Sequence, residues 1–397
     1  MKQNIRNNIK TTYNIKEENS ILTLIIDSNS LLKNSLVNKL VNSYGEEYGG
    51  IINYYIRIAN ILKMRNFNFC YSFWDGNNSG QLRAYLYPDY KANRGKNYNS
   101  EPTSDYYKEL DNYVKRVLAY SANKRRNKQI KEKKKVKETE DEIFQHQRDI
   151  ICQINEDLFI RNIFSDAIDD VEGDDLIAYY VKNKKPNEKI VIISSDRDLT
   201  QLIKDDVCVY LVDLKKFVTP QNHKEIMGYT HENVVLKKIF TGDSSDNIKG
   251  IKGVGEKTFF ELFPEAKEKK MSINEIIDLS KKMIEERKNN KKKPLQSTEN
   301  IVNGVTDGCQ GDKIYEINKS IIDLSEPLLT ERAKELLDSY MYAPIDEEGR
   351  TYNHLYSIVT KYRLEQLYSE NQFSTFFSPF NALIETEKKF AKNYEES

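Results

Sequence analysis

The sequence VEGDDLIA at residues 171–178, followed by IVIISSDRD at residues 190–198, decides the fold of this chain. The apolar run from Leu176 to Val181 predicts a helix that enters a core. The second stretch begins with a short, continuous apolar run, which is typical of a buried parallel strand, and Asp196 and Asp198 follow it. Open α/β sheets bind their ligands at the carboxyl ends of parallel strands. The pattern therefore predicts an α/β fold with a ligand site at this edge of the sheet.

Acidic side chains gather at the predicted edge. They are Glu172, Asp174, Asp175, Asp196 and Asp198. Two unit charges about 4 Å apart repel by roughly 4 kcal/mol at an effective dielectric of about 20, so such a cluster persists if divalent cations neutralise it. Oxygen ligands alone suit hard ions such as magnesium or manganese. The alternative is that these are surface acids at helix N-caps and strand ends, where Asp and Ser are common.

The composition narrows the class of protein. The chain has 397 residues, enough for one large domain or two smaller ones, and its 61 Lys+Arg balance 61 Asp+Glu. The bases form runs, so the zero net charge does not exclude a nucleic-acid partner. No run of about 18 apolar residues predicts a membrane span, and residues 1–20 are expected to form a polar tail. The four scattered cysteines indicate reduced thiols in a cytoplasmic protein, and the four histidines lack zinc-ligand spacing.

Two further predicted strands end in aspartate. Asp27 follows the apolar residues 21–26, and Asp75 follows the aromatic-rich residues 67–74. Residues 30–64 have apolar side chains at three- and four-residue spacing, which predicts helices. A single aspartate of this kind is an ordinary cap, but its repetition at several strand ends favours a common site.

Basic and aromatic side chains alternate between residues 83 and 96. Arg and Lys suit phosphates, and Tyr stacks on bases or sugars, so Arg83 and Tyr90 are candidates for contact with nucleic acid. The alternative is an exposed loop. Residues 92–155 then resemble an insertion of two helices, the first over residues 104–120, joined by a basic run from Lys124 to Lys137. Such runs are usually solvated, but this one could also follow a nucleic-acid strand.

The second half of the chain adds acids and a glycine turn. After a strand over residues 207–212 and a helix over residues 231–240 come GDSSDN, with Asp243 and Asp246, and IKGIKGVGEKT at residues 248–258. A glycine turn that opens a helix offers backbone N–H groups to a phosphate. The candidate contacts here are Lys249, Lys252, Gly253, Gly255 and Lys257. We expect residues 281–313 to form a flexible loop and residues 320–385 to be helical.

These motifs resemble the 5′ nucleases of the flap endonuclease family. Asp27, WDG, YPDYKANR, VEGDD, ISSDRD, GDSSDN and GIKGVGEKT occur in the family's order over about residues 21–265. Within the family, the chain is most similar to phage-encoded 5′-to-3′ exonucleases, especially the T-even type ribonuclease H, which residues 322–324 and 340–344 also resemble. The GIKGVG turn is closer to the wider family than to that phage type.

The resemblance implies a mostly parallel sheet flanked by helices, a PIN-like 5′ nuclease core. It also implies a helical arch over the insertion at about residues 92–155 and a helix–three-turn–helix element that grips duplex DNA. The nuclease core would occupy residues 21–220. The DNA-binding and C-terminal helical region would occupy residues 221–397.

The resemblance also implies two metal sites, for Mg²⁺ or Mn²⁺. The first would be held by Asp27, Asp75, Glu172, Asp174 and Asp175, and the second by Asp196, Asp198, Asp243 and Asp246. Lys91 and Arg94 match basic residues that contact the scissile phosphate. Gly253 and Gly255 match the turn that holds the duplex backbone, where a monovalent cation is expected.

The implied activity is hydrolysis of phosphodiester bonds near a 5′ end or junction. The expected role is removal of RNA primers or flaps during phage DNA replication, with RNase H activity, in the cytoplasm of the host if the chain is phage-encoded. Expected partners are DNA and RNA–DNA junctions with a 5′ end, a single-stranded-DNA-binding protein and a sliding clamp. Alternative interpretations are a PIN-type ribonuclease, a non-catalytic structural DNA-binding protein and an aspartyl-phosphate receiver. The glycine turn and long insertion count against the first, the nine intact acids against the second, and the chain length against the third.

Overall fold

The computed structural model describes residues 20–76, 79–92, 129–165, 171–307, 309–311 and 313–395. Arg94, residues 1–19 of the predicted tail and the helix predicted over residues 104–120 lie outside this part of the chain. The chain forms two compact units. Unit 1 consists of Met1–Gly76, Glu132–Thr219 and Thr330–Ser397, and unit 2 of Asn77–Lys131 and Pro220–Leu329.

Unit 1 is built on a six-stranded sheet with the order β3-β2-β1-β4-β5-β6. The strands are β1 (Ile21–Asp27), β2 (Phe69–Trp74), β3 (Arg161–Phe164), β4 (Glu188–Ser194), β5 (Val207–Leu211) and β6 (Lys216–Val218). Neighbouring strands run parallel except β5 and β6, which are antiparallel. The predicted α/β fold with a mostly parallel sheet is therefore confirmed. The short strands β3 and β6 were not predicted, because neither has the length or the apolar run that marks the other four.

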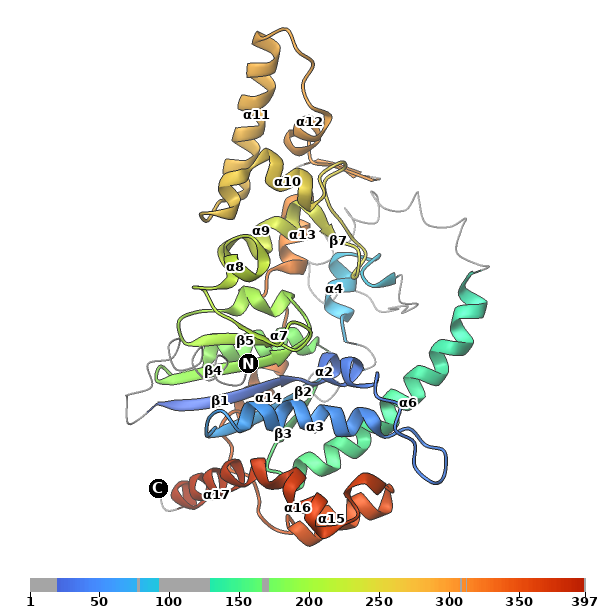
Figure 1. Ribbon diagram of the computed structural model, residues 1–397. Helices are drawn as coiled ribbons and strands as arrows, with labels where there is room; N and C mark the ends of the chain where they lie inside the picture. The colour runs from blue at the N-terminus through green and yellow to red at the C-terminus, as the bar shows by residue number, and fades with distance from the viewer. Residues whose placement is uncertain are drawn as a thin grey trace. The chain divides into compact units, whose positions relative to one another are not determined.

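Helices cover both faces of this sheet. The helices α3 (Gly49–Leu62) and α6 (Gln129–Asp157) pack on one face, and α7 (Gly173–Asn183) packs on the other (Figure 1). Successive side chains of β2 point to opposite faces of the sheet. Trp74 joins the core beneath α3, whereas the rings of Tyr71 and Phe73 lie 4.9 and 6.4 Å from that of Tyr180 on α7.

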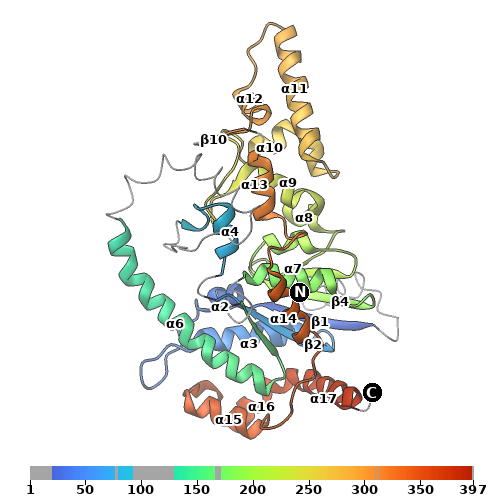
Figure 2. The ribbon, with the colours of Figure 1, turned by 180° about the vertical axis from the view of Figure 1, so that it is seen from behind.

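The last helices of the chain complete unit 1. They are α14 (Glu331–Tyr340), α15 (Tyr352–Lys361), α16 (Glu370–Phe377) and α17 (Asn381–Glu395). Phe377 and Phe380 pack edge-on against Tyr55 of α3, with ring centroids 6.0 and 5.9 Å away, and Figure 2 shows α15, α16 and α17 beside α3. This differs from the predicted division, which grouped residues 221–397 together. The apolar side chains of α15 to α17 are needed to cover α3, so these helices pack with the sheet.

Unit 2 is mainly helical. Its elements are α4 (Gln81–Leu86), α8 (His223–Met227), α9 (Val234–Thr241), β7 (Gly242–Asp243), β8 (Ile248–Lys249), α10 (Glu256–Leu262), α11 (Ile273–Asn289), α12 (Gln296–Val302), β9 (Val305–Thr306), β10 (Cys309–Gln310) and α13 (Lys313–Ile322). Its core joins α9, α10 and α13 through Phe240, Phe259 and Tyr315. Buried Asn318 donates to the carbonyls of Ile239 and Lys249 at 3.0 and 2.9 Å, which fixes β8 beside α9. In the described residues of the chain, no helix is long and apolar enough to span a membrane.

The flexible loop predicted over residues 281–313 is wrong. Helix α11 continues to Asn289, and α12 follows after a short connection. Ser272 and Glu275 form a capping box that starts α11, and buried Ile276 anchors its first turns. The lysines of α11 lie on its solvent face, where Lys is a good helix former. The prediction was wrong because it treated the charge of these lysines as a sign of disorder.

Candidate metal centre

Three aspartates end neighbouring strands at one edge of the sheet. Asp27 is the last residue of β1, Asp75 follows β2, and Asp196 follows β4 after one serine. Because β1 lies between β2 and β4, and adjacent strands are about 4.8 Å apart, these carboxylates share one edge. Helix α7 begins there, with Glu172 as its N-cap residue and Asp174 in its first turn.

Hydrogen bonds fix the orientation of these carboxylates. Ser194 Oγ donates to Asp27 Oδ2 at 2.5 Å. The backbone N–H of Gly173 donates to Asp75 Oδ1 at 2.7 Å, and that of Asp198 donates to Asp196 Oδ1 at 2.8 Å. The backbone N–H of Ser30 also donates to Asp27 Oδ1 at 3.2 Å, so both oxygens of Asp27 accept hydrogen bonds. A carboxylate has about four lone-pair sites, so these bonds orient the aspartates and leave acceptor capacity for a further ligand.

The carboxylates face one another. Burial raises the pKa of Asp27 to about 7 against a hydrogen bond from Ser194 that lowers it, and the charges of Asp196 and Asp75 raise it further. Burial also raises the pKa of Asp174 well above its usual value, and repulsion from Asp196, Asp27 and Asp75 adds to this effect. A centre that offers only oxygen atoms and repels its own negative charge fits a hard divalent cation.

The raised pKa of Asp27 predicts how stability depends on pH in metal-free protein. Its carboxyl keeps a proton to about pH 7 in the native state but loses it near pH 3.8 when unfolded. The native state therefore binds more protons between about pH 4 and 7, and its stability falls as the pH rises through that window. Thermal melts in chelator should show a smaller fall for Asp27→Asn than for the wild type. Identical pH profiles for the two proteins would contradict the prediction.

The close approach of Gly173 to Asp75 gives a second prediction. A Cβ at residue 173 would lie 2.9 Å from Asp75 Oδ1, so Gly173→Ala must push this carboxylate away. Because a shift of about 1 Å in a reacting group costs roughly 100-fold, we expect metal-dependent activity to fall about 10- to 100-fold. Alanine suits a helix better than glycine by about 1 kcal/mol, so the melting temperature should stay level or rise. Unchanged activity in a folded variant would show that activity does not depend on the present position of the Asp75 carboxylate.

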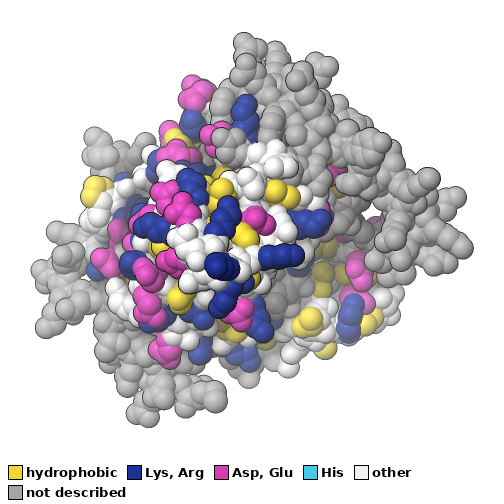
Figure 3. Space-filling view, turned by 90° about the horizontal axis from the view of Figure 1, so that it is seen from above, with side chains coloured by type: hydrophobic (Ala, Val, Ile, Leu, Met, Phe, Trp, Pro, Cys, Tyr) yellow, Lys and Arg dark blue, Asp and Glu magenta, His cyan; other side chains and the backbone are white. Residues whose placement is uncertain are grey.

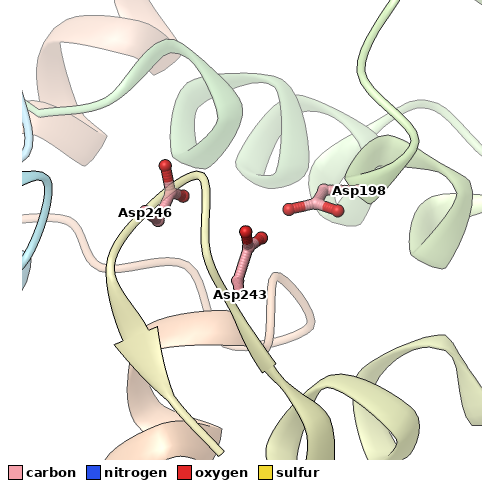
Figure 4. A group of neighbouring side chains, drawn as sticks. All are labelled: Asp198, Asp243 and Asp246. Atoms are coloured by element: carbon pink, nitrogen blue, oxygen red, sulfur yellow. The ribbon is translucent and has the colours of Figure 1, made fainter. Parts of the chain in front are cut away.

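The other predicted ligands belong to several elements. Asp175 is buried on α7. In unit 1, Asp198 begins a 3₁₀ helix that follows β4. In unit 2, Asp243 ends β7, and Asp246 lies in the turn that leads to β8 (Figure 4).

Lys238 is a neighbour of Asp243 that the sequence analysis missed. Its Nζ lies 2.5 Å from Asp243 Oδ2, and both side chains are largely buried. Burial raises the pKa of Asp243, but the Lys238 charge together with donors from Ser245 outweighs this effect and lowers the pKa to about 2. Asp243 is therefore ionised at neutral pH without a metal.

Two side chains that were predicted to contact nucleic acid are buried. Arg83 is 5% exposed, and its Nε donates to the carbonyl of Ile321 at 2.8 Å. Tyr90 is 2% exposed within the core of unit 2, and its hydroxyl donates to Asp246 Oδ2 at 3.4 Å. The helix α4 buries four consecutive residues, Arg83 to Leu86, so the basic and aromatic side chains in this part of the stretch serve packing. Lys91 is partly exposed, and its backbone N–H donates to the Asp246 carbonyl at 2.9 Å.

The glycine turn before α10 is accessible. Gly253 has a φ of 78°, and a Cβ built at Gly253 or Gly255 meets nothing within 4 Å. The side chains of Lys249, Lys252 and Lys257 are exposed around it. A backbone phosphate could therefore approach these N–H groups, as the sequence motif predicts.

Residues that position the aspartates were also missed. Ser194 donates to Asp27 and accepts from the Asp196 N–H at 2.8 Å. The guanidinium of Arg148 lies 5.6 Å from the Trp74 ring, and Arg148 donates to the Asp75 carbonyl at 3.2 Å. The serine pair in the ISSDRD motif could have indicated Ser194. Nothing in the sequence could have indicated Arg148, because it is 73 residues away from Asp75.

The chain is similar to known proteins. Residues 22–237, more than half of the chain, match the family model described as "5′-3′ exonuclease, N-terminal resolvase-like domain". DNA polymerase I of Bacillus subtilis (strain 168) is 34% identical over 125 residues, which are 30% of this chain and 14% of that protein. A 5′-3′ exonuclease of Mycoplasma pneumoniae is 38% identical over 100 residues, 24% of this chain and 34% of its own length. The chain thus matches about a third or less of the length of these relatives.

One solved structure adds to the comparison. A bacteriophage T5 flap endonuclease, crystallised with DNA and metal ions, aligns with 92% of this chain and 99% of its own. Its TM-score is 0.50 and its sequence identity is 16%. The likeness therefore concerns the fold.

Proposed function

Because the chain belongs to the family of 5′-3′ exonuclease N-terminal resolvase-like domains, as its motifs predicted, we propose that it is a metal-dependent 5′ nuclease. It hydrolyses phosphodiester bonds near a 5′ end or junction in DNA. The observation that carries the proposal is the set of mutually repelling carboxylates at the carboxyl edge of the sheet.

Two divalent cations, Mg²⁺ or Mn²⁺, complete the site in this proposal. Asp27, Asp75, Glu172, Asp174 and Asp175 would hold the first, and Asp196, Asp198, Asp243 and Asp246 the second. When bound, such ions neutralise the scissile phosphate and make water a stronger nucleophile. The carboxylates themselves place and orient the ions, and Ser194 and Gly173 hold Asp27 and Asp75 in position.

The basic residues act on the phosphate. Lys91 and Arg94 stabilise the negative charge that develops on it, and no proton transfer from a side chain is required. The exposed turn at Gly253 and Gly255 binds the duplex backbone, with a monovalent cation. Specificity then comes from the shape of a junction with a free 5′ end, since backbone contacts carry no base sequence.

The finer role that we propose is removal of flaps and RNA primers, including RNase H activity. A single-stranded-DNA-binding protein and a sliding clamp are the protein partners that we infer from the resemblance. Metal sites of the proposed kind would act on DNA and RNA backbones alike, which is compatible with this role.

One digestion experiment tests the proposal. Chelator-treated protein is incubated with a 5′-labelled flap, a nicked duplex and an RNA–DNA hybrid, each with magnesium, manganese, zinc or no metal. We expect cleavage from the 5′ side with magnesium or manganese and none in chelator. Full activity in excess chelator would exclude the metal-dependent mechanism, and the pattern across the three substrates would rank the roles.

A further inference from the structure

The hairpin formed by α11 and α12 has a basic tip whose positive charge is not balanced by acidic residues within the tip. The tip, residues 287–293, contains Arg287, Lys288, Lys291, Lys292 and Lys293 and no acid. All four lysines are exposed, and in the described part of the chain no carboxylate forms an ion pair with any of the five cations. Figure 3 shows Lys and Arg side chains on the face that carries this hairpin, with Asp and Glu side chains among them. The metal centre described above does not use them.

The base of the hairpin is tied to the glycine turn. Asn300 of α12, 6% exposed, donates to the carbonyl of Lys252 at 2.8 Å. The N–H of Lys252 in turn donates to the carbonyl of Val305 at 2.8 Å. Ile276 and Ile301 belong to the core of unit 2, so both helices of the hairpin are anchored beside the turn. The tip is therefore held at a fixed place relative to Gly253.

Lys291 occupies a backbone position that lysine does not favour. Its φ is 53°, in the left-handed region, at the end of α11. The N–H of Lys292 donates to the Arg287 carbonyl at 2.8 Å, which closes a helix-ending turn in which glycine is the usual residue. Glycine would be more stable at this position, so the Lys291 side chain adds a positive charge to the tip at a cost in stability.

We propose that the basic tip of the α11–α12 hairpin is a second contact for the backbone of duplex DNA, beyond the glycine turn. The proposal rests on the proposed function, which places a duplex at that turn. Helix α12 has seven residues and is about 10 Å long, so with the connecting residues the tip lies roughly 15 Å from Lys252. A duplex has one negative charge per about 1.7 Å of its axis and thus offers the tip several phosphates. The rigid base favours a duplex over a single strand, because a fixed spacing between two contacts matches a stiff partner.

Binding measurements on the full chain test this contact. Fluorescence anisotropy in chelator, where no cleavage occurs, is measured against a long duplex of about 20 base pairs and a single strand of the same length. The tip variant replaces Lys291, Lys292 and Lys293 by serine. The matched control replaces Lys361, Lys389 and Lys392, exposed lysines on or near α15 and α17, by serine and thus changes the net charge equally.

For the tip variant, we expect affinity for the long duplex to fall about tenfold or more at low salt. The slope of log K against log salt should shrink by about 2 to 3, near 0.9 for each lost phosphate contact. Binding of the single strand by the tip variant, and of the long duplex by the control variant, should change little. Lys291→Gly alone should melt at a higher temperature and bind the long duplex more weakly.

Other outcomes would overturn the inference. Equal losses in the tip and control variants would indicate general electrostatic attraction. Equal losses on single strand and duplex would assign the tip to single-stranded nucleic acid, and no loss at all would leave a solvated charge run. Magnesium-dependent cleavage by the wild type is measured separately, so a failure of the proposed nuclease activity is not confused with a failure of the tip.

Discussion

Replacing Asp174 by alanine is expected to lower magnesium-dependent cleavage about 1,000-fold, the cost of losing a central electrostatic group in a catalytic site. Asp174 faces Asp196, Asp27 and Asp75, so its carboxylate lies where a cation shared by these groups would bind. DNA binding should survive or improve, because a negative charge near the phosphate is removed. The melting temperature of metal-free protein should rise at neutral pH, since one repelling carboxylate is lost. Single-turnover cleavage, anisotropy and thermal melts measure the three effects.

A matched variant separates the site from general charge effects. Glu335→Ala removes an exposed carboxylate from α14 and should leave cleavage unchanged. Asp196→Ala should behave like Asp174→Ala, because Asp196 contributes to the same repulsion. If both site variants cleave at nearly the wild-type rate, the nuclease centre lies elsewhere.

The sequence predicted the carboxylate edge because its signals are local. β1, β2 and β4 each contain a short run of mainly apolar residues, and an aspartate is the last residue of the strand or follows it within two residues. Parallel strands bring such ends together whatever the rest of the chain does. The acids at the start of α7 were also predicted to belong to the site from a local signal, because they directly precede an apolar helical run.

The sequence could not predict contacts between distant segments. Glu188 is fully buried at the start of β4 and accepts from the Tyr180 hydroxyl at 2.9 Å and from the hydroxyl of Tyr342. Nothing in the neighbourhood of either residue in the sequence indicates the second bond, which spans 154 residues. The burial of Arg83 and the membership of α15 to α17 in unit 1 escaped prediction for the same reason, because each depends on packing against residues far along the chain.

The ion pair between Arg161 and Glu387 attaches the end of the chain to the sheet. Arg161 opens β3 and Glu387 lies on α17, and their side chains are 7% and 0% exposed. Arg161 Nη2 donates to Glu387 Oε2 at 2.8 Å and to the Ala343 carbonyl at 3.0 Å. Because Glu387→Ala leaves the guanidinium buried without its counter-charge, we expect it to lower the free energy of unfolding by about 3–5 kcal/mol. Urea unfolding, followed by far-ultraviolet circular dichroism, measures this change.

Two further variants show whether the lost counter-charge is the cause. Glu385→Ala removes an exposed carboxylate from the same helix and should change stability by less than about 0.5 kcal/mol. The double variant Arg161→Met with Glu387→Leu replaces the buried pair by apolar side chains and should recover most of the loss, since such replacements are often neutral or stabilising. A double variant as unstable as Glu387→Ala would mean that the pair acts through its hydrogen bonds, including the one to Ala343. A small effect of Glu387→Ala itself would mean that the packing of α17, such as the Phe390 ring 4.9 Å from that of Phe69, suffices to hold the end of the chain.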